Sequence, residues 1–279
     1  MNSDPISRID FPMQFLTRLK LLITVLILSF ALFRQETVGE DTSQLSTGFS
    51  LKYIVIDPGH GGRDPGCVSQ SGVKEKDITL SVSRKLAEVL RQKNEYEVFL
   101  TRADDRFMSL RQRVAFANQE SFPPNQSIFL SLHCNSFKDQ RIHGMESFKF
   151  DLDATDELAA ELVERENAQE SVDKFDFMII NLRKRGNEKY TEQVARILQK
   201  LLVKQLGVKN RNLHASRNAG VRGAPFYVLA WTKMPSVLLE LGFISNDAER
   251  KKMTEEKYQD RIASALAKGI KKFDQQLPE

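Results

Sequence analysis

The chain has 279 residues, of which 41% are hydrophobic and 28% are charged, and this is the composition of an ordinary globular protein. It excludes a collagen, a low-complexity chain and a protein that is disordered over long stretches. Two cysteines exclude a small disulfide-stapled domain and a zinc module with four cysteines. The net charge of +4 comes from interspersed charges rather than from a dense basic stripe, so we expect no nucleic-acid partner.

An uncharged apolar run lies close to the N-terminus. It extends from Leu21 to Phe33, directly after Arg18 and Lys20. As a helix this run spans about 20 Å, which is short of the roughly 30 Å hydrocarbon core of a bilayer. A short apolar run after basic residues is typical of a secretory signal peptide. We therefore expect residues 1–39 to be a signal peptide or an N-terminal anchor, to be the only part of the chain that meets a membrane, and to export the rest.

Residues 40–50 form a polar linker, and one folded domain is expected over residues 51–275. Strands are indicated by β-branched runs and helices by apolar residues at helical spacing after a capping residue. In chain order we expect strand 52–57, helix 77–93, strand 96–102, helix 110–118, strands 127–132 and 144–150, helices 154–171 and 189–206, strands 225–229 and 236–241, and helix 247–274. This alternation predicts an α/β fold, a single domain with a twisted, mostly parallel sheet and helices on both faces.

Three of the expected strands end in a side chain that can bind a metal or move a proton. His60 follows the first strand, His133 follows the third, and Glu240 lies near the end of the last. Because sites in open α/β sheets form at the carboxyl ends of the strands, we expect these side chains to converge. Glu75 lies in the loop region after His60 and could reach the same edge.

The residue types at these strand ends indicate metal-assisted hydrolysis. Two imidazoles and a carboxylate are the ligand set of a catalytic zinc site, which leaves a fourth position for water. A second carboxylate could take the proton of that water and pass it to a leaving nitrogen. Glu240 is notable because a carboxylate in the apolar strand VLLELGF costs several kcal/mol unless it is paired, protonated or bound to a metal. We therefore expect hydrolysis of an amide or an ester.

Seven stretches of the domain match one known family, in the order of that family. Together they make the chain from about Lys52 to Phe273 resemble the zinc-dependent N-acetylmuramoyl-L-alanine amidases, the type-3 amidase domain of peptidoglycan hydrolases. The matching stretches are IVIDPGHGGRDPG (54–66), GVKEKD (72–77), LTRADDRFMSLRQRVAFAN (100–118), SLHCN (131–135), ERENA (164–168), GVRGAPFYVL (220–229) and MPSVLLELGFISN (234–246).

The resemblance implies a role for each candidate residue. It implies that His60, Glu75 and His133 bind Zn²⁺ and that Glu240 is the catalytic glutamate. The implied reaction is hydrolysis of the amide between N-acetylmuramic acid and L-alanine in peptidoglycan, for cell-wall remodelling or daughter-cell separation. The implied location is the periplasm or the cell-wall space, with a protein activator of the division machinery as a further partner. Asn135, which follows a ligand histidine, is expected either to orient a substrate carbonyl or to stabilise the turn.

Two other functions remain open. One is a non-catalytic peptidoglycan-binding regulator with an amidase-like cleft, although such a protein is expected to lose a ligand or the glutamate. The other is a zinc amidohydrolase or peptidase that acts on a different extracellular substrate through the same site.

The chain departs from the family in two places. Cys134 and Cys67 stand where relatives usually or often carry a small residue such as alanine, which indicates either two independent substitutions or a disulfide near the site. Some relatives carry an inhibitory helix that plugs the zinc site. The acidic helix around residues 157–170 lies in the matching region without a long insertion, so we expect it to pack on the domain, with self-inhibition as the alternative.

Overall fold

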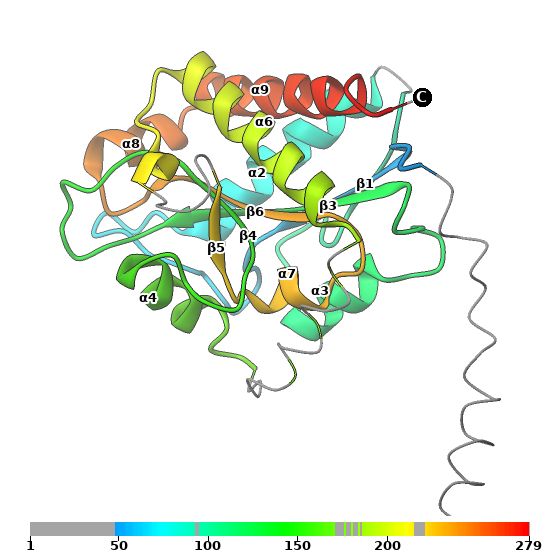
Figure 1. The fold of residues 1–279 in the computed structure, drawn as a ribbon. Helices are drawn as coiled ribbons and strands as arrows, with labels where there is room; N and C mark the ends of the chain where they lie inside the picture. The colour runs from blue at the N-terminus through cyan, green and yellow to red at the C-terminus, as the bar shows by residue number, and fades with distance from the viewer. Residues whose placement is uncertain are drawn as a thin grey trace, which may run out of the picture. The chain divides into compact units, whose positions relative to one another are not determined.

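A six-stranded sheet forms the centre of the described part of the chain (Figure 1). The structure is a computed structural model that describes residues 48–92, 95–170, 176, 180, 184, 186–214 and 221–278. The expected leader at residues 1–39 and most of the linker lie outside the described residues. The strands are β1 (Tyr53–Pro58), β2 (Glu97–Leu100), β3 (Ser127–Asn135), β4 (Glu146–Phe150), β5 (Arg222–Ala224) and β6 (Ser236–Phe243).

The spatial order of the strands is β2-β1-β3-β6-β4-β5. Strands β2, β1, β3 and β6 are mutually parallel, whereas β4 runs antiparallel to β6 and pairs in parallel with β5. Every residue of the central strands β3 and β6 is buried, as expected for strands that are covered on both faces. The carboxyl ends of β1, β3 and β6 therefore meet at one edge of the sheet, which is where the sequence predicts the site.

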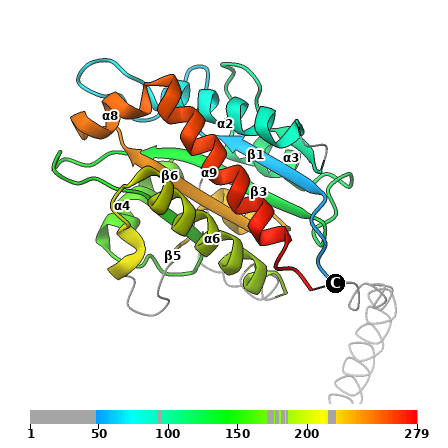
Figure 2. The same cartoon turned by 90° about the horizontal axis from the view of Figure 1, so that it is seen from above.

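Helices cover both faces of the sheet, as Figures 1 and 2 show. The long helices α2, α6 and α9 share one apolar core with one face, and α3, α4 and α7 share a second core with the other. Among the described residues, none of the helices is long and apolar enough to cross a membrane. The helices are α2 (Glu75–Arg91), α3 (Leu110–Ala117), α4 (Glu157–Glu166), α6 (Glu188–Leu206), α7 (Tyr227–Trp231), α8 (Asp247–Met253) and α9 (Glu256–Asp274), with a 3₁₀ turn at Arg211–His214.

The mostly parallel α/β sheet expected from the sequence is confirmed, and local signals account for several helix ends. Ser109 caps α3 in a capping box with Gln112, because each side chain bonds the backbone N–H of the other residue. Gly207 ends α6 in the left-handed conformation, with φ of 67°.

Most expected elements differ from the observed ones by one to five residues at an end, and three differences go further. The segment 225–229 is not a strand: β5 ends just before Pro225, which lacks the N–H that a ladder needs, and α7 follows. The single helix expected over residues 247–274 is two helices, and Asn246 caps the first of them. Helix α2 begins at Glu75 rather than after Asp77, so Glu75 belongs to the first helical turn instead of the preceding loop.

Candidate metal centre and active site

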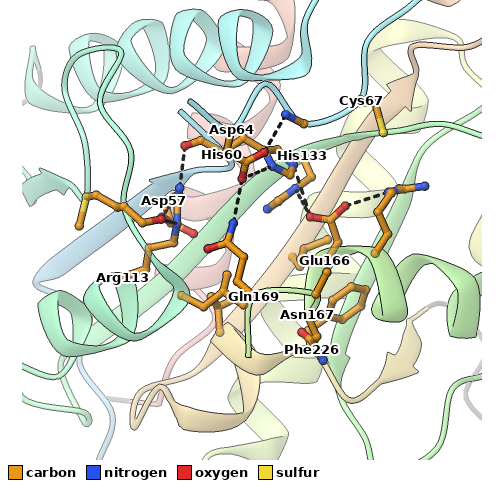
Figure 3. Close-up of a pocket in the computed structure, with 17 residues that line it drawn as sticks. Asp57, His60, Asp64, Cys67, Arg113, His133, Glu166, Asn167, Gln169 and Phe226 are labelled. Atoms are coloured by element: carbon orange, nitrogen blue, oxygen red, sulfur yellow. Dashed lines mark hydrogen bonds and ion pairs between the residues drawn. The ribbon is translucent and has the colours of Figure 1, made fainter. Parts of the chain in front are cut away.

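The three expected metal ligands converge at the carboxyl edge of the sheet. His60 follows β1, His133 lies near the end of the neighbouring strand β3, and Glu75 opens α2. Glu75 Oε1 lies 3.2 Å from His60 Nε2 and 3.1 Å from His133 Nδ1. Figure 3 shows the two imidazoles facing the same space. Side chains 73 positions apart in the sequence are thus brought into one cluster by the parallel pairing of β1 with β3.

A fourth side chain, Glu166, completes this cluster. Glu166 is the last residue of α4, and its Oε2 lies 3.4 Å from His60 Nε2 and 3.3 Å from His133 Nδ1. Glu166 is not among the candidate residues that the sequence indicates. Its one signal was the match of the stretch ERENA to the family pattern, which gave no reason to choose it over the other glutamates of the helix.

The distances between the imidazole nitrogens and the carboxylate oxygens fit a tetrahedral divalent metal, and all four ligand atoms lie within 4.8 Å of one another. Ligands held about 2.1 Å from a shared tetrahedral zinc lie about 3.4 Å from one another. The four distances between an imidazole nitrogen and a carboxylate oxygen are 3.1 to 3.4 Å. His60 Nε2 is buried without a hydrogen-bond partner, as expected of a nitrogen reserved for a metal. Two nearby carboxylates also repel each other unless a cation lies between them.

Hydrogen bonds orient the candidate ligands from outside the cluster. Asp64 Oδ2 lies 3.0 Å from His60 Nδ1, the carboxylate–histidine arrangement that fixes the ring of a metal ligand. The carboxylate of Glu75 accepts the backbone N–H groups of Cys67 and Cys134 at 2.9 and 2.8 Å. Burial raises the pKa of Glu75, but the two imidazoles outweigh burial and hold this pKa well below its ordinary value. Glu75 is therefore an anion that is ready to bind a cation.

Glycines make room for the imidazole rings. A Cβ at Gly59 would lie 2.5 Å from the His133 ring. A Cβ at Gly66 would lie 2.5 Å from the His60 ring and 2.6 Å from Glu75 Oε2. Backbone and rings therefore approach each other more closely here than any other residue type permits.

Glu240 lies beside the cluster without belonging to it. It pairs with His133 across β3 and β6, so both side chains emerge on the same face of the sheet. Glu240 is 1% exposed, and neither of its carboxylate oxygens has a hydrogen-bond partner. Burial, together with the charges of Glu75 and Glu166, raises its pKa well above the ordinary value. A buried carboxyl beside the candidate ligands is placed as a general acid or base must be.

Asn135 and the two cysteines surround the candidate ligands. The Asn135 side chain donates to Glu146 Oε2 at 3.0 Å and accepts from the backbone N–H of Ser136 at 2.8 Å. Its amide is thus engaged within the protein, and its contact with substrate stays a prediction. Cys67 and Cys134 are both free thiols, and burial raises the pKa of each.

A cavity of about 260 Å³ opens beside the candidate ligands (Figure 3). One wall comes from His60, His133 and Glu166 of the cluster, and residues 167–169, directly after α4, form another. A further part of the lining is apolar and comes from Met108, Leu110, Phe226, Val228 and Leu238.

Polar contacts hold the end of α4 over this cavity. Asn167 donates to the carbonyl of Pro225 at 2.8 Å and accepts from the N–H of Tyr227 at 2.9 Å. Gln169 donates to Asp64 Oδ2 at 3.1 Å. Glu170 pairs with Arg111 at 2.7 Å. Glu166 is therefore kept in place by neighbours outside the cluster as well as by the cluster itself.

These features place the protein in one class, the α/β domains that carry a candidate metal-hydrolase site at the carboxyl edge of a parallel sheet. Comparison with known proteins places the chain within that class. The family model described as N-acetylmuramoyl-L-alanine amidase matches residues 54–272. The chain therefore belongs to the N-acetylmuramoyl-L-alanine amidase family.

Individual relatives agree with this assignment. The chain is 31% identical over 229 residues to the amidase AmiC of Neisseria meningitidis serogroup B, a match that covers 79% of this chain and 52% of that protein. It is 29% identical over 232 residues to AmiC of Escherichia coli O6:H1, with the same two shares. The chain thus spans about half the length of these two curated relatives.

Solved structures of similar fold come from the same family. An N-acetylmuramoyl-L-alanine amidase of Clostridium difficile 630 matches with a TM-score of 0.61 and 26% identity, covering 81% of this chain and 98% of that one. The catalytic domain of CwlV from Bacillus (Paenibacillus) polymyxa matches with a TM-score of 0.60 and 28% identity, covering 80% and 98%. The CwlD amidase of Clostridioides difficile, solved in complex with the GerS lipoprotein, matches with a TM-score of 0.57 and 27% identity, covering 80% and 98%.

Proposed function

We propose that this chain is a zinc-dependent amidase that hydrolyses the bond between N-acetylmuramic acid and L-alanine in peptidoglycan. The observation that carries the proposal is the tetrahedral spacing of His60, Glu75, His133 and Glu166 beside the unpartnered carboxyl of Glu240. His60, Glu75 and His133 are the permanent ligands. The substrate is inferred from the family, and the hydrolytic chemistry is inferred from the residues of the site.

Each group has a distinct task in the proposed reaction. Zinc, when bound, polarises the amide carbonyl and makes water more acidic. Glu240 accepts a proton from the attacking water and delivers it to the departing L-alanine nitrogen. The raised pKa of Glu240 suits it to the second half of this cycle, when the carboxyl must give up the proton that it has gained.

The proposed function also includes a role for Glu166, whose carboxylate completes the metal cluster. A catalytic zinc site needs a fourth position for water, and the Glu166 carboxylate takes that position in the cluster. We therefore propose that the end of α4 inhibits the enzyme until it moves away, which is the self-inhibition that the sequence left as an alternative. The solved complex of CwlD with a lipoprotein makes a protein partner a reasonable agent of release here.

The organisation of the whole chain follows from this function. Residues 1–39 are proposed as the signal peptide or anchor, residues 40–50 as a linker and residues 51–275 as the catalytic domain. Export would bring the domain to the periplasm or the cell-wall space, where peptidoglycan lies. A role in wall remodelling or daughter-cell separation fits an enzyme that is held closed until it is needed.

Metal analysis combined with muropeptide digestion tests this function. The purified domain is expected to contain one equivalent of zinc and to release L-alanine-terminated peptides, identified by mass spectrometry, only without chelator. The same assay is run on Glu166→Ala. This variant lacks the carboxylate that is proposed to occupy the fourth position, so its activity can be detected even where the wild type is inhibited. Zinc binding without digestion by either protein would favour the non-catalytic regulator, and cleavage at another bond would favour a different amidohydrolase.

A further inference from the structure

The residue that begins the metal cluster has an uncommon backbone conformation. Within the described part of the chain, His60 is the one non-glycine residue with positive φ, at 58°. An ordinary residue adopts this region at a cost of about 1 kcal/mol or more, and it persists only where the surroundings enforce it. The direction of the His60 ring depends on this backbone, so whatever enforces the conformation also places the ligand.

Two buried arginines bind three consecutive carbonyl groups of this loop. Arg113 donates from Nη1 to the carbonyl of Pro58 at 2.7 Å and from Nη2 to the carbonyl of His60 at 2.6 Å. Arg102 donates to the carbonyl of Pro58 at 3.0 Å and to the carbonyl of Gly59 at 2.8 Å. No carbonyl from Pro58 to His60 is therefore free to rotate unless a charge-assisted hydrogen bond breaks.

Arg113 is itself fixed by a buried carboxylate, as Figure 3 shows. Its Nη1 lies 2.7 Å from Asp57 Oδ1, and the two side chains are 3% and 1% exposed. Thr101 and Ser131 donate their hydroxyl groups to Asp57 at 2.6 and 2.8 Å. Because apolar side chains of similar volume are often at least as stabilising as a buried ion pair, folding alone does not account for these charges.

We propose that Arg113 is a positioning residue of the metal centre, which acts on the metal through the backbone of His60. This inference rests on the proposed metal-dependent function. Asp64 orients the His60 ring, and Arg113 holds the main chain from which the ring projects. The planar fork of arginine reaches two carbonyls and a carboxylate together, which the single ammonium of a lysine does not.

The test compares Arg113→Lys with wild type and with Arg91→Lys. Arg91 also donates to a backbone carbonyl, that of Val98 at 2.6 Å, but it lies at the far end of α2 from Glu75. Zinc affinity is measured by competition with a chromophoric chelator, and the visible spectrum of the Co²⁺-loaded protein reports the ligand geometry. For Arg113→Lys we expect about 10- to 100-fold weaker zinc binding and a changed cobalt spectrum. Arg91→Lys is expected to match wild type in both.

Each outcome decides the inference. Zinc affinity within twofold of wild type, together with an unchanged cobalt spectrum, would overturn it. If Arg113→Lys does not fold, Asp57→Asn replaces it in the same two measurements, because this variant keeps the side-chain volume and removes the charge that fixes Arg113. If the wild type binds no zinc, the metal-dependent function itself is refuted. This outcome is distinguished from failure of the Arg113 inference because the wild type is measured in parallel.

Discussion

The two sides of the metal cluster are built differently. On the sheet side, His60, Glu75 and His133 come from adjoining strand ends and the first turn of α2. Their outer partners are the backbone N–H groups of Cys67 and Cys134 and the half-buried carboxylate of Asp64. On the helix side, Glu166 comes from the last residue of α4. Of this helix only Ala159 and Leu162 are buried as whole residues, although the Glu166 side chain is itself only 7% exposed.

In the proposed function, this difference separates three permanent ligands from a replaceable one. His133 cannot move without opening the core, because β3 is buried along its whole length, and Glu75 is itself fully buried. The end of α4 can move away from the cluster when water replaces the partners of a few hydrogen bonds, each worth about 0.5–1.5 kcal/mol. We therefore expect substitutions on the sheet side to destroy function or stability and substitutions on the helix side to increase activity.

The largest effect is expected at Glu240, on the sheet side. Glu240→Gln keeps the side-chain volume but cannot accept a proton, so the rate of muropeptide cleavage should fall by about 10²- to 10⁴-fold. The zinc content should stay at the wild-type value, since Glu240 is outside the cluster, and the unfolding midpoint should not fall, because the amide carries no charge to bury. Turnover of this variant at the wild-type rate would show that another group moves the proton.

Asp57→Asn should cost about 3 kcal/mol of unfolding free energy at neutral pH, because it leaves Arg113 buried without its counterion. Burial raises the pKa of Asp57, but its partners, Arg113 first among them, outweigh burial and hold this pKa below its ordinary value. The stabilisation is therefore complete above about pH 4 and is lost as the pH falls further. Urea unfolding of both metal-free proteins at pH 7 and pH 3 should show a smaller difference at the lower pH; an equal difference would contradict this assignment.

Glu166→Ala should increase activity, in contrast to substitutions on the sheet side. Removing this carboxylate frees the fourth position of the cluster, and we expect at least about a tenfold higher rate, which corresponds to ~1.4 kcal/mol. The matched control is Glu164→Ala, at an exposed position of the same helix. If both variants remain at the wild-type rate, the end of α4 does not inhibit the enzyme.

The smallest effect is expected at Asn167, which ties the end of α4 to the segment before α7. Asn167→Ala removes these bonds and should favour the open form by about 1 kcal/mol, giving an increase of up to about fivefold in the same assay. Asn187→Ala removes a comparable bond, to the carbonyl of Lys233, far from α4 in the sequence, and should leave the rate unchanged. A decrease for Asn167→Ala would mean that the closed segment supports catalysis.

The sequence predicts the sheet side of the cluster well because local patterns determine it. A β-branched strand that ends in a glycine turn places His60, and the buried strand before Asn135 places His133. The pairing of β3 with β6 then brings Glu240 next to His133. Their roles as ligands and as catalytic base stay predictions until metal and activity are measured.

The helix side could not be predicted in the same way. Five glutamates lie between positions 157 and 170, and no local pattern separates Glu166 from the others. Its position depends on how the end of α4 packs against segments far away in the sequence. The strand expected over residues 225–229 is wrong for a related reason. Its aromatic and β-branched residues favour a strand, whereas Pro225 and the packing of the second core favour the helix α7.

Asp64 links the two sides through a single oxygen atom. Its Oδ2 lies within hydrogen-bond distance of His60 Nδ1 and also accepts from the side chain of Gln169. Departure of the α4 segment would leave that oxygen entirely to the imidazole and strengthen the remaining bond. The ¹⁵N resonance of His60 Nδ1 should therefore shift on opening, which gives a spectroscopic signal for activation that requires no cell wall and no turnover.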